Sequence, residues 1–146
     1  MHNFAICLTN DDNVANIVLN VLYKKIKQEI PKSNISVFAS SHGNFSFDCG
    51  IFCLSELWYF AGEIFVFDMD SIEYINNLHQ DIKINFVFFN QNLDIKKMME
   101  LLNDNIVNIH LDRSSLDNFS RITGRNSISL DKYIELCKNI EVKSNE

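Results

Sequence analysis

The chain has 146 residues, of which 47% are hydrophobic, and a formal net charge of -6 at pH 7. This length suits one compact domain with a buried core and is too short for two. The negative charge argues against non-specific binding to nucleic acid, which favours basic surfaces. No apolar run approaches the ~20 residues that span a bilayer, and Asp11 and Asp12 interrupt the apolar start, so we expect no membrane segment and no signal peptide.

Four scattered cysteines form no CxxC pair. We therefore expect free thiols in a reducing cytoplasm, no zinc site and no bound cofactor. The chain is crowded with Asn, Ile and Lys, which have AT-rich codons. This bias indicates an AT-rich viral or bacterial genome, such as that of a phage.

The chain opens with a predicted β-α-β unit. Buried strands are expected at 4–8 and 35–39, and between them a helix runs from Val14 to Ile30, where Pro31 stops it. The inward stripe of this helix is expected to contain Val14, Ile17, Val18, Val21, Leu22 and Ile26.

The segment 50–61 has two interpretations. Its apolar residues have helical spacing, so we predict a buried helix that ends at Gly62. The same residues also favour β-structure, so a strand is the alternative. The predicted inward face contains Ile51, Leu54, Leu57, Trp58 and Ala61.

A second β-α-β unit occupies the centre of the chain. The apolar runs 64–67 and 84–89 show no alternation, as expected of parallel strands buried on both faces. Between them, Asp70 and Glu73 have the spacing of a capping box, which predicts a short helix to about Leu78. The crossover should be right-handed.

The last third predicts a strand at 106–111 and three helices. The first helix spans 93–102, with Ile95, Met98, Met99 and Leu102 inward. The second follows Asp112, points Leu116, Phe119 and Ile122 inward and ends at Gly124; the third spans 133–137, capped by Ser129 or Asp131. Together the elements predict an α/β fold: a single doubly wound, mainly parallel five-stranded sheet in one domain, 1–140, with helices on both faces and a frayed tail at 141–146.

The sequence VFDMDS contains the candidate catalytic residues Asp68 and Asp70. It resembles the first motif of the haloacid-dehalogenase phosphatases, in which the first Asp attacks phosphorus and the second serves as acid and base. Ile72 departs from the Thr or Val of that motif. The structural alternative is that Asp68 ends a strand and Asp70 caps a helix.

A third candidate catalytic residue, His42, lies in a loop after the second predicted strand. There it could act as a base or contact a phosphate. The structural alternative is an ordinary surface histidine.

In open α/β sheets, ligands bind beyond the carboxyl ends of the strands. At those ends the sequence places polar side chains and lacks a GxGxxG or Walker loop, which favours a hydroxyl-rich ligand such as a sugar over a phosphate. Loops are polar in any protein, which is the structural alternative. The candidate ligand-binding residues are Thr9, Asn10, Asp11, Ser40, Ser41, Gly43, Asn44, Asn90, Gln91, Asp112, Arg113 and Ser114.

Three stretches, FAGEIFVFDMDSIEYINN, INFVFFNQN and NIVNIHLDRSSLDNFSRITGR, resemble the N-terminal Rossmann-like half of phage-type two-domain (GT-B-like) glycosyltransferases. The resemblance implies a domain that holds the acceptor, with the donor sugar nucleotide bound mostly by a second domain for which this chain has no room. It therefore implies a binding or assembly protein, and leaves catalysis open. If transfer occurs, the resemblance points to Asp68, Asp70 and His42. The alternative is a small phosphatase-like or nucleotide-processing enzyme.

The adjacent aromatic residues Trp58, Tyr59 and Phe60 cannot all point inward from one helix. Exposed aromatic side chains mark interfaces, so we expect a homo-oligomer contact or a protein partner at this position.

Overall fold

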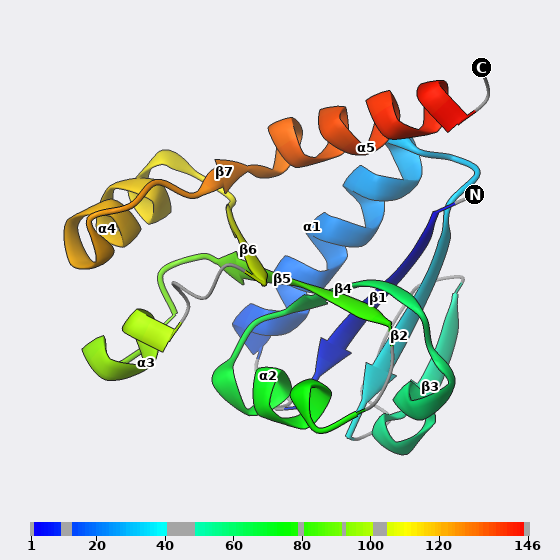
Figure 1. Cartoon of the computed structure of the whole chain (residues 1–146), viewed down its shortest axis with the longest axis horizontal. Coiled ribbons are helices and arrows are strands. Elements are labelled where there is room, and N and C mark those ends of the chain that lie inside the picture. Colours follow the sequence, from blue (N-terminus) through cyan, green and yellow to red (C-terminus); the bar gives the residue numbers. More distant parts are fainter. Residues whose placement is uncertain are drawn as a thin grey trace. The chain divides into compact units, whose positions relative to one another are not determined.

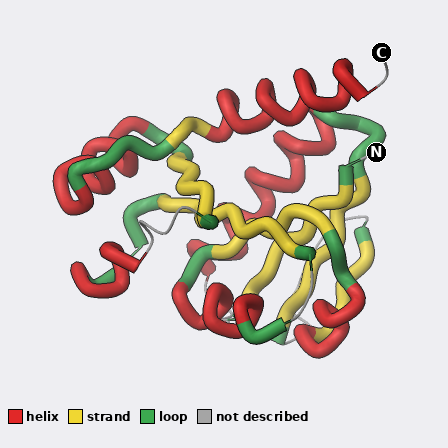
Figure 2. Tube along the Cα trace, in the orientation of Figure 1, coloured by secondary structure: helices red, strands yellow, loops and turns green. Residues whose placement is uncertain are grey.

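The computed structural model describes residues 2–9, 13–40, 49–78, 81–91, 93–100 and 105–144 (Figure 1). Within these residues, seven strands form one sheet in the order β3-β2-β1-β4-β5-β6-β7, with helices between the strands (Figure 2). The strands are β1 (Asn3–Leu8), β2 (Asn34–Ala39), β3 (Gly50–Cys53), β4 (Gly62–Val66), β5 (Ile82–Phe88), β6 (Ile106–His110) and β7 (Ile128–Ser129). The helices are α1 (Asn13–Glu29), the 3-10 helix η1 (Leu54–Tyr59), α2 (Met69–Asn76), α3 (Ile95–Glu100), α4 (Arg113–Thr123) and α5 (Leu130–Ser144).

The pairings β1–β2, β1–β4, β2–β3 and β6–β7 are parallel. The predicted parallel α/β sheet flanked by helices is therefore confirmed, but the predicted number of strands is wrong. The strand β7 was not expected, and β3 was only the alternative interpretation of its segment. β7 has only two residues, too few for any periodic pattern, and β3 lies in the segment that was interpreted as a helix.

The segment 50–61 follows its alternative interpretation in its first part. Residues 50–53 form β3, which pairs with β2 in the register Phe38↔Phe52. The helix that follows, η1, is a short 3-10 helix in which Leu57 is buried and Trp58 is 46% exposed. A parallel crossover usually needs a dozen or more residues, so the short connection from β3 to β4 has no room for a full α-helix.

Contacts divide the chain into two compact units, Met1–Ile84 and Asn85–Glu146. In the first unit, β1 has buried side chains from Phe4 to Leu8 with no alternation, so both of its faces are covered. The rings of Phe4 and Phe65 lie 5.9 Å apart, centroid to centroid, across the β1–β4 pair. This core holds in place the strand ends that carry the candidate site.

The predicted inward stripe of α1 is only half right. Val18, Leu22 and Ile26 are buried, together with Ala15 and Leu19. The other three predicted residues, Val14, Ile17 and Val21, are exposed. Apolar residues occupy much of the circumference of this helix, so their spacing alone does not show which part of that arc faces the sheet.

The predicted start of α2 is wrong by two residues. Its N-cap is Asp68, which has extended backbone and accepts a hydrogen bond from the Ser71 amide at 2.8 Å. Asp70 lies in the first turn of the helix instead. The side chain of an N-cap residue reaches the amide of the third helical residue, which from Asp68 is Ser71.

In the second unit, α4 matches the prediction. Asp112 caps its start, and Gly124 ends it in the left-handed conformation. Phe119 is buried and its ring lies 5.8 Å from that of Phe88, whereas the predicted inward residue Ile122 is exposed.

The other two helices of this unit differ from the prediction. α3 begins at Ile95, two residues later than expected. Of its described inward residues only Met98 is buried, because Ile95 is 70% exposed and Met99 is also exposed. α5 extends to Ser144, so residues 141–144 are helical rather than a frayed tail, since no helix breaker follows Cys137. The Lys132 amide donates to Ser129 Oγ at 3.1 Å, which supports Ser129 as the cap.

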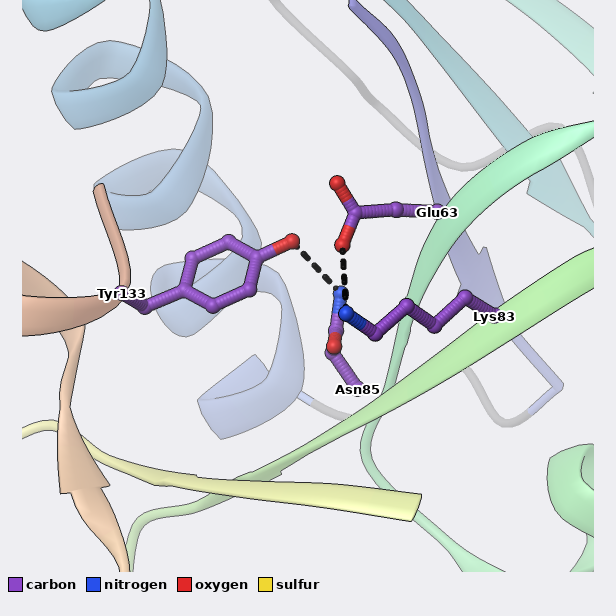
Figure 3. A network of polar contacts seen from close by, with 4 residues as sticks. All are labelled: Glu63, Lys83, Asn85 and Tyr133. Carbon is purple, nitrogen blue, oxygen red and sulfur yellow. Dashed lines mark hydrogen bonds and ion pairs between the residues drawn. The ribbon is translucent and has the colours of Figure 1, made fainter. Parts of the chain in front are cut away.

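Two polar contacts are drawn in Figure 3, one in each unit. In the first unit, Lys83 Nζ lies 3.7 Å from Glu63 Oε1, a pair exposed enough to contribute little to stability. In the second unit, Asn85 Nδ2 donates to Tyr133 Oη at 2.8 Å, and the Asn85 side chain is fully buried. This buried hydrogen bond joins β5 to α5.

Replacing Tyr133 with Phe is expected to lower the free energy of unfolding by about 1–3 kcal/mol, because it removes the hydroxyl that accepts from the buried Asn85 amide. Urea denaturation followed by circular dichroism measures the change. The matched control is Tyr59→Phe. The side chain of Tyr59 is 86% exposed, so this variant should have the same free energy of unfolding as the original chain. Equal stability of Tyr133→Phe and the original chain would show that the hydrogen bond is dispensable.

Candidate functional site

The candidate site lies in the first unit, where the strand order reverses. β1 pairs with β2 on one side and with β4 on the other, while the chain visits β2 and β3 before it returns to β4. In parallel α/β sheets, ligands bind beyond the carboxyl ends of the strands at such a reversal. Thr9, Ser40 and Asp68 follow β1, β2 and β4 at this edge.

A hydrogen-bonded cluster joins the ends of β1 and β4. Thr9 Oγ1 donates to Asp68 Oδ2 at 2.6 Å, and the Ser71 amide donates to Asp68 Oδ1 at 2.8 Å. Ser71 Oγ donates to Thr9 Oγ1 at 3.5 Å. Both carboxylate oxygens of Asp68 are therefore engaged, and the side chain is held in one orientation.

The end of β2 is tied to the same cluster. Ser40 Oγ donates to the carbonyl oxygen of Thr9 at 2.7 Å, and the Ser40 amide donates to that of Leu8 at 3.2 Å. The structure thus brings together three of the predicted site residues, Thr9, Ser40 and Asp68, from three neighbouring strands. They present hydroxyl and carboxylate groups along one edge.

Two members of the cluster were not predicted from the sequence. Cys7 Sγ donates to Ser71 Oγ at 3.7 Å, and both residues are buried. Burial, with a further contribution from the nearby Asp68 carboxylate, raises the pKa of the Cys7 thiol to about 12. A thiol with this pKa is inert near neutral pH. Cys7 lies two residues before Thr9, and the period of two along a strand could have placed both on one face.

The pKa of Cys7 predicts a loss of stability in alkali. A pKa raised in the folded state, from 9.0 to about 12, stabilises the fold fully below pH 9 and loses that stabilisation as the pH rises toward 12. Between these values the free energy of unfolding should fall by about 1.4 kcal/mol per pH unit from this group.

Urea denaturation at pH 8 and pH 10 tests this expectation. Cys7→Ala should remove roughly 1 kcal/mol of the difference between the two pH values. The control Cys53→Ala, at an exposed cysteine, should leave the difference unchanged. An identical pH dependence of stability in the original chain, Cys7→Ala and Cys53→Ala would contradict the raised pKa of Cys7.

The remaining predicted residues of this edge are only partly described. Asp70 is exposed in the first turn of α2. Asn10, Asp11, Ser41, His42, Gly43 and Asn44 lie outside the described residues. The roles suggested for them, including that of His42, stay predictions.

The second unit contains the other predicted ligand-binding residues. Asn90 has a left-handed backbone, with φ of 66°, and its side-chain amide donates to Ser114 Oγ at 3.2 Å. The Asn118 side-chain amide donates to Asn90 Oδ1 at 2.7 Å. Gln91 folds back onto its own strand, accepting from the Phe89 amide and donating to the Val87 carbonyl oxygen. These contacts shape the turn after β5.

The end of β6 is likewise organised by local contacts. The Ser115 amide donates to Asp112 Oδ1 at 2.8 Å, and this bond to the helix start lowers the pKa of the Asp112 carboxyl group. His110 Nδ1 lies 2.7 Å from Ser127 Oγ, and burial lowers the pKa of the His110 imidazole. Arg113 is exposed on the first turn of α4. Asp112 thus has a structural role in capping this helix.

Within the described residues, no three His, Cys, Asp or Glu side chains gather in a way that could hold a metal ion. None of the described helices combines the length and the apolar character that crossing a bilayer requires.

The strand order β3-β2-β1-β4-β5-β6 defines a Rossmann-like α/β protein. No family model matches the sequence, and no curated protein matches it. Among solved structures, the chain is similar to a Rex-family repressor, with a TM-score of 0.45 and 14% identity over 83% of this chain and 59% of that chain. The chain thus spans less than two thirds of that protein.

Proposed function

We propose that this chain is a glycosyltransferase-like domain that binds a sugar-containing ligand and does not act as an independent enzyme. The observation that carries the proposal is the cluster of Thr9, Asp68 and Ser71 at the carboxyl ends of β1 and β4. Hydroxyl and carboxylate groups held at a strand-order reversal suit a ligand with many hydroxyl groups.

The charge at this edge favours a sugar over a phosphate. A helix N-terminus attracts anions, and α1 begins directly after this edge. In the sequence, Asp11 and Asp12 come immediately before that helix and add two negative charges to this part of the chain. A phosphate would be repelled, whereas sugar hydroxyls can donate to carboxylates.

The contacts of Asp68 give this carboxylate a structural role. Its two oxygens accept hydrogen bonds from Thr9 Oγ1 and from the Ser71 amide, so capping of α2 accounts for the side chain without a catalytic step. The phosphatase-like or nucleotide-processing alternative on Asp68 and Asp70 is therefore less well supported. The resemblance to the acceptor-binding half of phage-type glycosyltransferases points to binding. The scattered cysteines favour the cytoplasm, that of the host if the chain is phage-encoded, and the net charge of -6 disfavours a nucleic-acid partner.

The exposed aromatic residues support a partner in the same role. Trp58 and Tyr59 are both exposed on η1, and Phe60 follows them. A homo-oligomer contact or a protein partner at these residues fits a binding or assembly protein.

The test is the thermal stability of the purified chain with a panel of sugars, sugar nucleotides, nucleotides and Mg²⁺. A ligand at ~100 times its dissociation constant should stabilise the fold by about 2.7 kcal/mol, which is a readily measured shift. We expect a shift with at least one sugar and none with nucleotides.

Matched variants locate the binding. Thr9→Val removes the hydroxyl that bonds Asp68 and should abolish the ligand shift, whereas Ser55→Ala, on exposed η1, should retain it. If no sugar stabilises the chain, or if nucleotides alone do, the proposal is wrong. Release of phosphate from a phosphate ester that Asp68→Asn abolishes would restore the enzymatic alternative.

A further inference from the structure

A second concave region lies in the first unit, away from the carboxyl edge. Two adjoining hollows of about 300 Å³ and 500 Å³ share Phe52, Tyr59 and Phe60 in their walls. The larger hollow extends to Asn3 and Asn34, the first residues of β1 and β2. It therefore reaches the amino ends of the strands, opposite the site described above.

The hollow exists because the crossover from β3 to β4 is short. η1 replaces a full α-helix, and Phe38 and Phe52 on neighbouring strands line the hollow, with Phe52 exposed and Phe38 buried. Their rings lie 5.5 Å apart, centroid to centroid, and the Phe60 ring meets Phe38 edge-on at 5.7 Å. The Phe52 ring lies over Gly50, where an added Cβ would approach it to 2.7 Å.

The smaller hollow is not wholly aromatic. Glu56 and Ser36 complete its wall, and the Glu56 carboxylate is positioned by a hydrogen bond that it accepts from the Cys53 amide at 2.9 Å. No Lys or Arg occurs among the described residues that line either hollow. The charge on this surface is therefore negative.

Aromatic faces and a carboxylate together attract one kind of ligand. The face of an aromatic ring is negative, and four aromatic side chains line the smaller hollow: Phe38, Phe52, Tyr59 and Phe60. A bulky cation whose charged head has no hydrogen-bond donor is weakly hydrated, so its dehydration in such a hollow costs little free energy. The aromatic rings and the carboxylate then attract its charge. We infer that this hollow binds an organic cation of the quaternary-ammonium class. The charged head of the cation lies near Glu56, and Tyr59 lies at the mouth of the hollow.

Choline and its neutral carbon isostere, 3,3-dimethylbutan-1-ol, test the role of charge directly. The two probes have the same shape, and the fluorescence of Trp58, the single tryptophan of the chain and the neighbour of Tyr59, together with calorimetric titration, reports binding. We expect choline to bind at least about tenfold more tightly than the isostere, a difference of the size that desolvated cation–π contacts supply. Equal binding of both probes, or no binding of choline, would overturn the inference.

Variants at exposed positions locate the site without risk to the fold. Tyr59→Leu keeps an apolar side chain but removes the ring, and should weaken choline binding by about three- to tenfold, whereas Tyr59→Phe should retain it. Glu56→Gln keeps an oxygen for the Cys53 amide but removes the charge, and should weaken choline binding several-fold while leaving the isostere unaffected. Unchanged choline affinity in both Tyr59→Leu and Glu56→Gln would place the cation elsewhere.

Discussion

Replacing Asp68 with Ala is expected to lower the free energy of unfolding by about 2–4 kcal/mol. The change removes the N-cap of α2, and it also removes the acceptor of the Thr9 hydroxyl, which lies 2.6 Å from Asp68 Oδ2. Loss of a cap costs about 1 kcal/mol, and hydrogen bonds to charged groups contribute roughly 1.5–3 kcal/mol. Urea denaturation of the purified variant measures the total.

Asp68→Asn is the matched control for this prediction. Its amide oxygen can still accept from the Ser71 amide, and its nitrogen can donate to Thr9 Oγ1, so it should lose about 1 kcal/mol or less. A stable Asp68→Ala chain would mean that the cluster does not hold β1 and α2 together. The pair of variants also separates a structural carboxylate from a nucleophile, because only a nucleophile requires the charge.

Replacing Gly62 with Ala is expected to destabilise the first unit by about 3 kcal/mol or more. Gly62 begins β4 with φ of +142°, a conformation that side chains disfavour. A Cβ at this position would lie 2.5 Å from the backbone oxygen of Asn3, at the start of β1, and backbone cannot move aside as a flexible side chain can. The strain therefore falls on the β1–β4 pair, whose carboxyl ends form the candidate site.

Gly124→Ala provides the comparison. Gly124 also has positive φ, at +73°, but an added Cβ would meet no atom within 4 Å. Only the cost of the left-handed backbone remains, about 1 kcal/mol. The midpoint of thermal unfolding should be clearly lower for Gly62→Ala than for Gly124→Ala. The reverse order would contradict the close approach of β1 and β4.

The central strands could be predicted from the sequence because their signal is strong. The runs Phe4–Leu8 and Ile64–Phe67 are apolar without alternation. This pattern is expected of strands that are covered on both faces. β3 was only the second interpretation of its segment, because its residues GIFC also fit a helical spacing. The exposed side of α1 was predicted wrongly because the spacing of apolar residues shows that a helix has an apolar surface. It does not show which part of a wide apolar surface packs against the sheet.

The candidate site was predictable in outline and not in detail. The rule for carboxyl ends named Thr9, Ser40 and Asp68, and the structure places all three in one hydrogen-bonded edge. Ser71 and Cys7 were missed because they join the cluster only when Asp68 is the N-cap of α2. The capping-box spacing instead indicated Asp70, two residues later. The aromatic hollow beside η1 depends on a short crossover that the predicted helix had concealed.

The measurement that tests the proposed function most directly is the amide NMR spectrum of the ¹⁵N-labelled chain during titration with the sugar that most stabilises it. We predict that the largest shifts fall on Thr9, Ser40, Asp68 and Ser71, with no comparable change at Tyr59. Saturable shifts at these four amides would place the ligand at the carboxyl ends of β1, β2 and β4. Shifts confined to other residues, or none with any sugar at millimolar concentration, would contradict a sugar-binding role for this edge.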